Sequence, residues 1–208
     1  MDDIITLLIS ISALVTAIAT LIKDVIKAKK EIEETLPKKI KHQSDIDMKI
    51  HSRIEEIKEY LNADRVQIYD FHNGGHYANG RSALKTSCSF EVVRNGIEGH
   101  QKELQAVPLS CIPQFVQELV KNGELKVDDL EEIKNTMPST YQLKKEQDIA
   151  SFYDIILNDE KGEPIGFLAF QYTKTNCVNF TKEEKNQILK LKFFIEENLK
   201  DMVSKNKK

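Results

Sequence analysis

A glycine-rich segment at residues 71–81 combines residue types that can hold a small ligand. Consecutive glycines after a strand permit positive φ and expose backbone N–H groups, and the histidine, asparagine and arginine side chains around them supply directional hydrogen-bond donors. The segment therefore predicts a site for a small polar or anionic ligand. Its candidate residues are His72, Asn73, Gly74, Gly75, Arg81, Lys85 and Glu91. The alternative is a mobile loop in which the glycines only turn the chain.

The same region gives less support to metal or thiol chemistry. His72 and His76 are four residues apart, a spacing that aligns two imidazoles on a helix, but the two glycines between them disfavour a helix, so no metal site is expected. Cys88 belongs to an alternating stretch, which is typical of a buried and inert thiol. The residues predicted to share its face are Leu84, Phe90 and Val92.

Composition excludes several classes of protein. The 208 residues are 40% hydrophobic and 30% charged, which suffices for a packed core, and the net charge of −3 argues against a dedicated nucleic-acid-binding protein. Three cysteines without short spacing favour a reducing compartment. Hydrolase, P-loop, zinc-peptidase and dinucleotide-binding signatures are missing from the sequence, so enzymes of those classes are not expected. Only four of the 30 basic residues are arginine, which suits AT-rich coding and is compatible with a phage or another mobile element.

The first part of the chain contains an uncharged stretch, residues 4–22. Nineteen helical residues rise about 28 Å, close to the roughly 30 Å hydrocarbon core of a bilayer. Acidic residues precede the stretch and Lys23 ends it, unlike a cleavable signal peptide. Because lysines outnumber acidic residues by seven to four over residues 23–41, we predict a single-pass protein of the inner (cytoplasmic) membrane with its N-terminus outside and its C-terminal domain in the cytoplasm. A buried core helix is the alternative.

Residues 23–61 have the pattern of amphipathic, coiled-coil-like helices. Pro37 is expected to break the first helix, and Asp45 suits the N-cap of a second one. The second helix carries apolar residues at 4-3-4 spacing, namely Ile50, Ile54, Ile57 and Leu61. Such spacing is typical of a coiled-coil seam, so a homodimer is expected. A single amphipathic helix packed on the following domain explains the same stripe.

Residues 62–208 change to a pattern of alternating strands and short helices. Strands are expected at residues 65–71, 84–93, 124–127, 151–157 and 165–172, the last two as a hairpin around Gly162. Helices are expected between Pro113 and Gly123, from Asp128 with Glu131, and from Thr181, which forms a capping box with Glu184. The order predicts an α+β fold in which helices flank an antiparallel β-sheet.

This order resembles a GAF domain, the PAS-like sensor module, over residues 46–199. The resemblance rests on residues 61–69 as the entry from helix to first strand, the hairpin at 158–172, and the closing helix at 181–199. It implies a sensory domain that binds a small ligand or a protein partner. Because some GAF-like proteins reduce methionine sulfoxide with cysteines, it also implies a cysteine-dependent redox enzyme as an alternative.

Together these features predict a membrane-anchored cytoplasmic sensory or regulatory module rather than an enzyme. The expected partners are the membrane, a second copy of the chain, and a small molecule or a protein, with no nucleic acid and no cofactor. A scaffolding membrane protein without a ligand is the remaining alternative.

Overall fold

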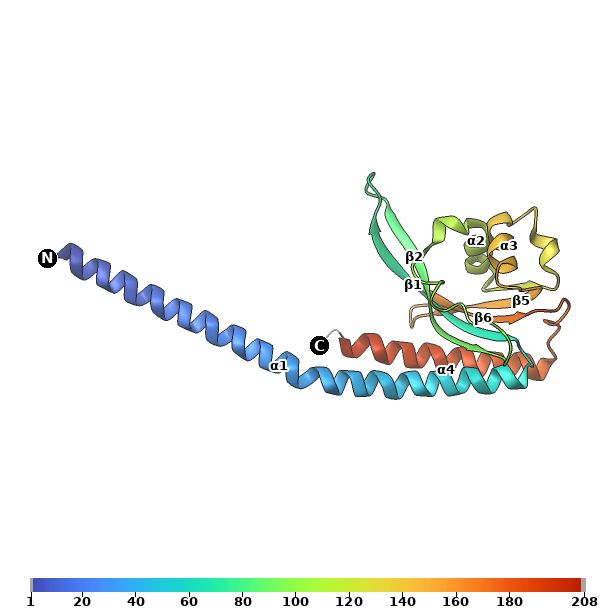
Figure 1. Cartoon of the computed structure of the whole chain (residues 1–208), viewed down its shortest axis with the longest axis horizontal. Coiled ribbons are helices and arrows are strands. Elements are labelled where there is room, and N and C mark those ends of the chain that lie inside the picture. The colour runs from blue at the N-terminus through green and yellow to red at the C-terminus, as the bar shows by residue number, and fades with distance from the viewer. Residues whose placement is uncertain (1, 207–208) are drawn as a thin grey trace. The chain divides into compact units, whose positions relative to one another are not determined.

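The computed structural model describes the backbone of residues 2–206 and the side chains of residues 14–29 and 36–200. The chain divides into two compact units, Met1–Asp47 and Met48–Lys208. Figure 1 shows the first unit as part of one helix and the second as a sheet covered by helices. We describe the two units separately.

The first unit belongs to helix α1 (Asp2–Tyr60). This helix continues through Pro37, so the predicted break there and the predicted N-cap at Asp45 are wrong. Proline removes one backbone hydrogen bond, but the lysine, glutamate and leucine residues around it favour a helix strongly enough to continue it. None of the helices is long and apolar enough to cross a membrane within the part of the chain whose side chains are described. Residues 4–13 of the predicted span lie outside that part.

The second unit is built on one antiparallel six-stranded sheet with the order β3-β2-β1-β6-β5-β4. Its strands are β1 (Arg65–His76), β2 (Ser82–Val93), β3 (Val107–Pro108), β4 (Glu124–Val127), β5 (Ser151–Asn158) and β6 (Pro164–Tyr172). The helices α2 (Pro113–Asn122) and α3 (Pro138–Lys145) lie on one face, and residues 48–60 of α1 lie with α4 (Lys182–Asn206) on the other (Figure 1). Two short 3-10 helices are η1 (Leu109–Cys111) and η2 (Leu130–Ile133). The predicted α+β fold is confirmed.

Local sequence signals account for most element ends. Pro113 occupies the first turn of α2, and Gly123 ends it in the left-handed conformation with φ 77°. At the start of α4, the Thr181 N–H donates to Glu184 Oε2 (2.6 Å) and the Glu184 N–H donates to Thr181 Oγ1 (3.2 Å). The predicted capping box is therefore confirmed. The cap of η2 is Asp129, not Asp128, because its side chain accepts the Glu131 N–H.

The 4-3-4 stripe of α1 is part of the core of the second unit. Ile50 and Ile54 are fully buried, and Ile57 and Leu61 nearly so. From α4, Ile188, Leu191 and Ile195 are buried as well. The stripe thus belongs to an amphipathic helix packed on its own domain, the alternative to an intermolecular seam over these residues. The opposite face of the sheet carries the second hydrophobic cluster, which joins Phe152 and Phe167 to α2 and α3.

Candidate functional site

The glycine-rich segment forms a β-hairpin in the structure, not a loop. β1 continues through His76 and pairs with β2 in the register His72↔Lys85 and His76↔Ser82. Its pairing with β6 stops at Asp70↔Gly166, so the hairpin extends beyond the rest of the sheet (Figure 1). Two glycines allow the backbone of this hairpin to adopt its conformation. Gly75 has φ +97° at a register shift, and a Cβ on Gly74 would lie 2.6 Å from the Ala83 carbonyl oxygen.

The predicted ligand residues of this hairpin are spread along it. Residues 72–82 are exposed, and Lys85 is half-buried. His72 Nε2 lies 2.8 Å from Ser87 Oγ, Asn73 Oδ1 accepts the Gly75 N–H at 3.0 Å, and the Arg81 guanidinium stacks on Tyr77 at 4.7 Å. These contacts are all made within the hairpin and its neighbours. They do not bring His72, Asn73 and Arg81 together around one cavity, and a ligand role for them stays a prediction.

Glu91, the seventh predicted residue, lies in a different environment. Its carboxylate accepts hydrogen bonds from Gln67 Nε2 (2.7 Å) and from the backbone N–H groups of His100 (3.0 Å) and Gln101 (2.9 Å). Arg65 Nε lies 3.4 Å away, and the Glu91 side chain is only 7% exposed. Such a carboxylate fixes the loop after β2 to the sheet.

Glu91 belongs to a buried polar network on the sheet face that α2 and α3 cover. Gln67 Oε1 accepts hydrogen bonds from the Tyr69 hydroxyl (2.9 Å) and from Gln171 Nε2 (2.8 Å). Gln171 Oε1 in turn accepts from Arg65 Nη1 (3.0 Å), whose Nη2 donates to the Glu98 carbonyl oxygen (2.6 Å). The network crosses three adjacent strands, β2, β1 and β6, and is a polar surface inside an otherwise apolar layer.

A buried ion pair continues this surface toward α3. Lys144 Nζ lies 3.4 Å from Asp154 Oδ2 on β5, and the two side chains are 7% and 0% exposed. Burial raises the pKa of Asp154 to about 6 against the opposing effect of Lys144. Burial also lowers the pKa of Lys144. The Lys144 ammonium lies 4.5 Å from the ring centre of Phe152, which holds it over the sheet.

Several polar atoms of this face make no hydrogen bond within the described part of the chain. They are Thr86 Oγ1, Asp154 Oδ1 and Arg65 Nε, all three inaccessible to solvent, although Arg65 Nε keeps its ion pair with Glu91 at 3.4 Å. Thr86 pairs with Phe71 and Asp154 with Ala169, and both partners pack with the cluster under α2 and α3. Buried polar atoms in folded proteins nearly always have hydrogen-bond partners, so these atoms are exceptions on this face.

Cys88 lies on this face because of a bulge. Ile68 pairs with Phe90 and Tyr69 with Cys88, so Ser89 is the extra residue. Cross-strand partners share a face, and Cys88 therefore faces the same side as Tyr69, whereas Phe90 faces the other side. The prediction that Cys88 and Phe90 share a face is wrong. Burial raises the pKa of the Cys88 thiol, the opposite of what a reactive cysteine needs.

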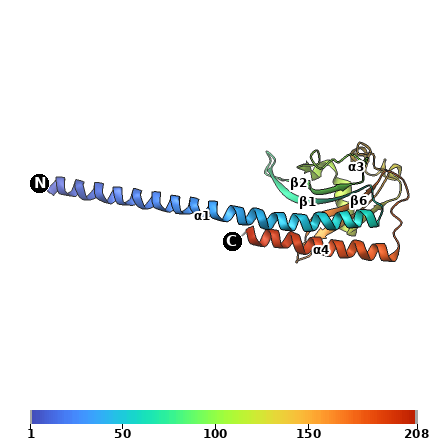
Figure 2. The ribbon, with the colours of Figure 1, turned by 60° about the horizontal axis from the view of Figure 1, so that its bottom comes forward.

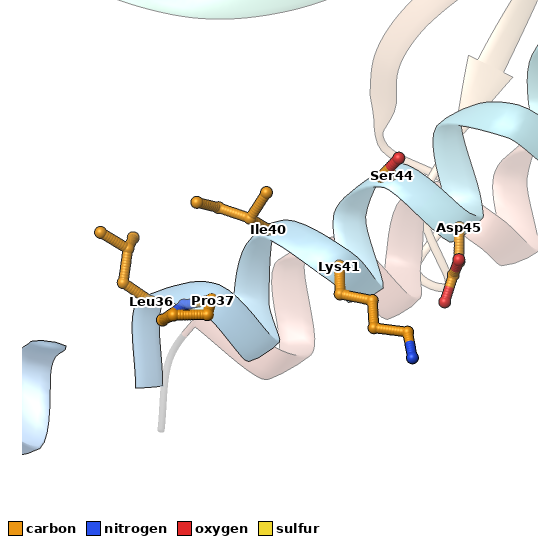
Figure 3. A pocket seen from close by; sticks show the side chains of 6 residues that line it. All are labelled: Leu36, Pro37, Ile40, Lys41, Ser44 and Asp45. Carbon is orange, nitrogen blue, oxygen red and sulfur yellow. The ribbon is translucent and has the colours of Figure 1, made fainter. Parts of the chain in front are cut away.

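Other candidate sites are weaker. A hollow of about 530 Å³ lies on α1 in the first unit, lined by Leu36, Pro37, Ile40, Lys41, Ser44 and Asp45. All six come from one helix, and Figure 3 shows Leu36 and Ile40 pointing to one side while Lys41 and Asp45 point to another. No polar groups converge there. Within the described residues, no cluster of three or more His, Cys, Asp or Glu has metal-binding geometry.

Comparison with known proteins defines the class of fold. No protein-family model and no curated protein sequence matches the chain. Among solved structures, a far-red cyanobacteriochrome photoreceptor matches with a TM-score of 0.59 and 12% identity over 84% of this chain and 96% of that one. The PixJ GAF domain of Thermosynechococcus elongatus, in its blue-light-absorbing form, has a TM-score of 0.58 and 13% identity over 79% and 94%.

A GAF domain region from Geobacter sulfurreducens PCA is similar to the same extent, with a TM-score of 0.57 and 14% identity over 77% of this chain and 97% of that one. The fold of the chain is therefore GAF-like, as the order of its elements predicts. At these identities the likeness concerns the fold alone.

The polar network itself is absent from the sequence-based candidates, Glu91 excepted. One signal marks it in the sequence, namely polar residues at alternate positions of strands that are otherwise apolar. Arg65 and Gln67 open β1 in this way, Asp154 interrupts β5, and Gln171 lies between Phe170 and Tyr172 in β6.

Proposed function

We propose that this protein is a membrane-anchored sensory or regulatory module, whose GAF-like domain binds a small polar molecule between the sheet and helices α2 and α3. The observation that carries the proposal is Asp154 Oδ1, a buried carboxylate oxygen that accepts no hydrogen bond within the described part of the chain. A ligand with an N–H or O–H group satisfies that oxygen, and the Lys144 ammonium limits how much negative charge remains for a cationic ligand.

The network also argues against a small anion as the preferred ligand. Arg65, the one guanidinium in the network, already donates to Gln171 and to the Glu98 carbonyl oxygen. Lys144 is paired with Asp154. An anion would have to displace one of these partners, whereas a neutral donor group would only add a bond.

The proposal extends to the membrane. Residues 4–22 carry no charge and are followed by an excess of lysines, which supports an anchor with the second unit in the cytoplasm. The test is extraction of membranes with alkaline carbonate. The chain should stay with the bilayer, and Leu14→Lys should release it whereas Leu36→Lys should not. Release of the unaltered chain would contradict the anchor.

Ligand binding is tested by thermal unfolding of the full chain in detergent micelles with a panel of nucleosides, sugars, amino acids and inorganic phosphate. A ligand at one hundred times its Kd adds about 2.7 kcal/mol, or roughly 5–10 °C for a domain of this size. Asp154→Asn should abolish the shift, and the double change Arg81→Gln with Lys85→Gln should leave it. The reverse result would move the site to the hairpin. No shift with any compound would favour a scaffold without a ligand.

A further inference from the structure

The hairpin of β1 and β2 has a sheet edge without a neighbouring strand. β1 pairs with β6 only as far as Asp70↔Gly166, whereas its pairing with β2 continues to His76↔Ser82. Figure 2 shows this hairpin reaching beyond the other strands, as Figure 1 does. Past Asp70, β1 therefore keeps β2 on one side and has no described strand on the other. An exposed edge of this kind is a template for pairing with a further strand.

Backbone hydrogen bonds identify the residues that face this edge. At the start of the β1–β2 pair, the Asp64 carbonyl oxygen accepts the Arg94 N–H at 2.8 Å. Backbone groups point to alternate sides along a strand, so the odd-numbered residues of β1 up to Asn73 turn toward β6. At the tip of the hairpin, the Tyr77 N–H donates across the turn toward β2, so His76 turns to the other side. The N–H and C=O groups of Asn73 and His76 therefore point to the open edge.

The two faces of the hairpin differ in chemistry. Phe71 and Leu84 lie on the face toward α2 and α3, where Leu84 is 52% exposed. The centre of the Phe71 ring lies 5.9 Å from that of Phe167, in the cluster under these helices. The opposite face carries His72 and its cross-strand partner Lys85. A strand added at the open edge thus places alternate side chains beside an apolar surface and a basic one.

The charge of the hairpin complements an acidic partner. Residues 71–90 contain no aspartate or glutamate, whereas the whole chain has a net charge of −3. Lys85 and Arg81 form no ion pair with any residue that the structure describes. The Lys85 side chain crosses over β1 at Gly74, because a Cβ on Gly74 would lie 2.5 Å from Lys85 Cε. An acidic segment beside β1 therefore meets a cation that has no competing partner.

We propose that this edge binds an extended acidic segment of a partner protein, which adds to β1 as a further strand. The backbone groups of Asn73 and His76 pair with the segment, and its acidic side chains lie beside Lys85. Phosphate groups of a bilayer or a nucleic acid only accept hydrogen bonds, so they would leave the carbonyl oxygens of the edge to water. The inference concerns a different surface from the proposed ligand site and does not depend on it.

The experiment measures binding of a fluorescein-labelled synthetic peptide that alternates valine with glutamate to the full chain in uncharged detergent micelles. Fluorescence anisotropy should give a Kd below about 1 mM. Lys85→Gln should raise this Kd about fivefold, because one cross-strand charge pair is lost. A peptide that alternates valine with lysine should not bind.

Two proline variants test the edge itself. Asn73→Pro removes an N–H from the open edge and should raise the Kd at least about tenfold, whereas strand edges tolerate proline where the N–H faces solvent. Ser82→Pro is the matched control. The Arg81 carbonyl oxygen accepts a bond from the β1 side, so the Ser82 N–H points to the opposite edge of the hairpin, and the Kd should not change. Both variants should unfold at the temperature of the unaltered chain.

Hydrogen exchange of the unaltered chain reports on the edge without any substitution. The valine–glutamate peptide should slow exchange of the Asn73 and His76 amides and leave that of Ser82 unchanged. The inference is overturned if this peptide does not bind at 1 mM, if Asn73→Pro and Ser82→Pro bind it equally, or if the three amides respond alike. Tighter binding of polyglutamate or of a single-stranded oligonucleotide would also overturn it, because charge alone or a nucleic acid would then explain the basic hairpin.

Discussion

Replacing Lys144 by methionine tests whether the buried ion pair shapes the site. Methionine keeps the apolar stem of the side chain and removes the ammonium that favours the ionised form of Asp154. Removing one partner of a buried ion pair lowers the free energy of unfolding by about 3–5 kcal/mol, because the other charge remains buried without its partner. Asp154 is fully buried, so in the variant its carboxyl must become protonated in the folded state or destabilise it.

The cost should depend on pH in a direction that the pKa determines. The folded pKa of Asp154, about 6, lies above its unfolded value near 3.8. The protonated carboxyl therefore stabilises the fold below about pH 4, and this contribution is lost as the pH rises to 6, about 3 kcal/mol in all. Without Lys144 the folded pKa rises further, so the loss continues above pH 6. The deficit of the variant should widen by about 1.4 kcal/mol per pH unit, or roughly 3 kcal/mol from pH 6 to pH 8.

Tyrosine signals make this measurable in the full chain. All six tyrosines lie after residue 59, in the second unit, so urea unfolding followed by tyrosine fluorescence reports on the GAF-like domain. Adding Asp154→Asn to Lys144→Met should remove the pH dependence above pH 6 and recover part of the stability at pH 8. A deficit of equal size at pH 5 and pH 8 would refute the argument that Lys144 controls the charge of Asp154.

Three further changes test other parts of the structure. Glu91→Gln should destabilise the second unit by about 1–3 kcal/mol and speed hydrogen exchange at residues 98–106, because two backbone N–H groups lose a charged acceptor; unchanged exchange would contradict it. Gly166→Ala should cost about 3 kcal/mol or more in urea unfolding, since its Cβ would collide with the Tyr69 carbonyl oxygen, and a neutral effect would mean that β1 can move. Thr181→Ala should cost about 1 kcal/mol and expose the first turn of α4 to exchange, whereas Thr175→Ala, outside any helix, should not.

The elements with strong local signals were predictable. The hairpin of β5 and β6 follows from two apolar strands around a polar turn, in which Gly162 has φ +81°. The sequence does not predict helix α3, because its eight residues have little apolar periodicity, although Pro138 begins it. At Pro37 the error is the opposite one, because the sequence predicts a break where the helix continues. The effect of Pro37 on the helix is local and limited, and the residues around it were enough to continue α1.

The candidate site was much harder to predict. The glycines at residues 72–81 predict a ligand site, but in the structure these residues form an exposed hairpin held by the pairing of β1 with β2. The bulge at Ser89 reversed the face of Cys88, and nothing in the alternation of β2 marks that extra residue. The sequence predicts Glu91 as a ligand residue together with the hairpin residues, yet its contacts are with Gln67, His100 and Gln101.

What the amino-acid sequence determined by itself is local: where helices begin, where hairpins turn, and which side of each helix is apolar. These properties depend on residues within one or two turns of each other, as for Thr181 and Glu184. The tertiary structure alone decided which polar groups meet. Arg65 and Gln171 are 106 residues apart, and they bond only because β1 pairs with β6 in one register. A register is a property of the whole sheet, so the buried polar face could not be read from any single segment.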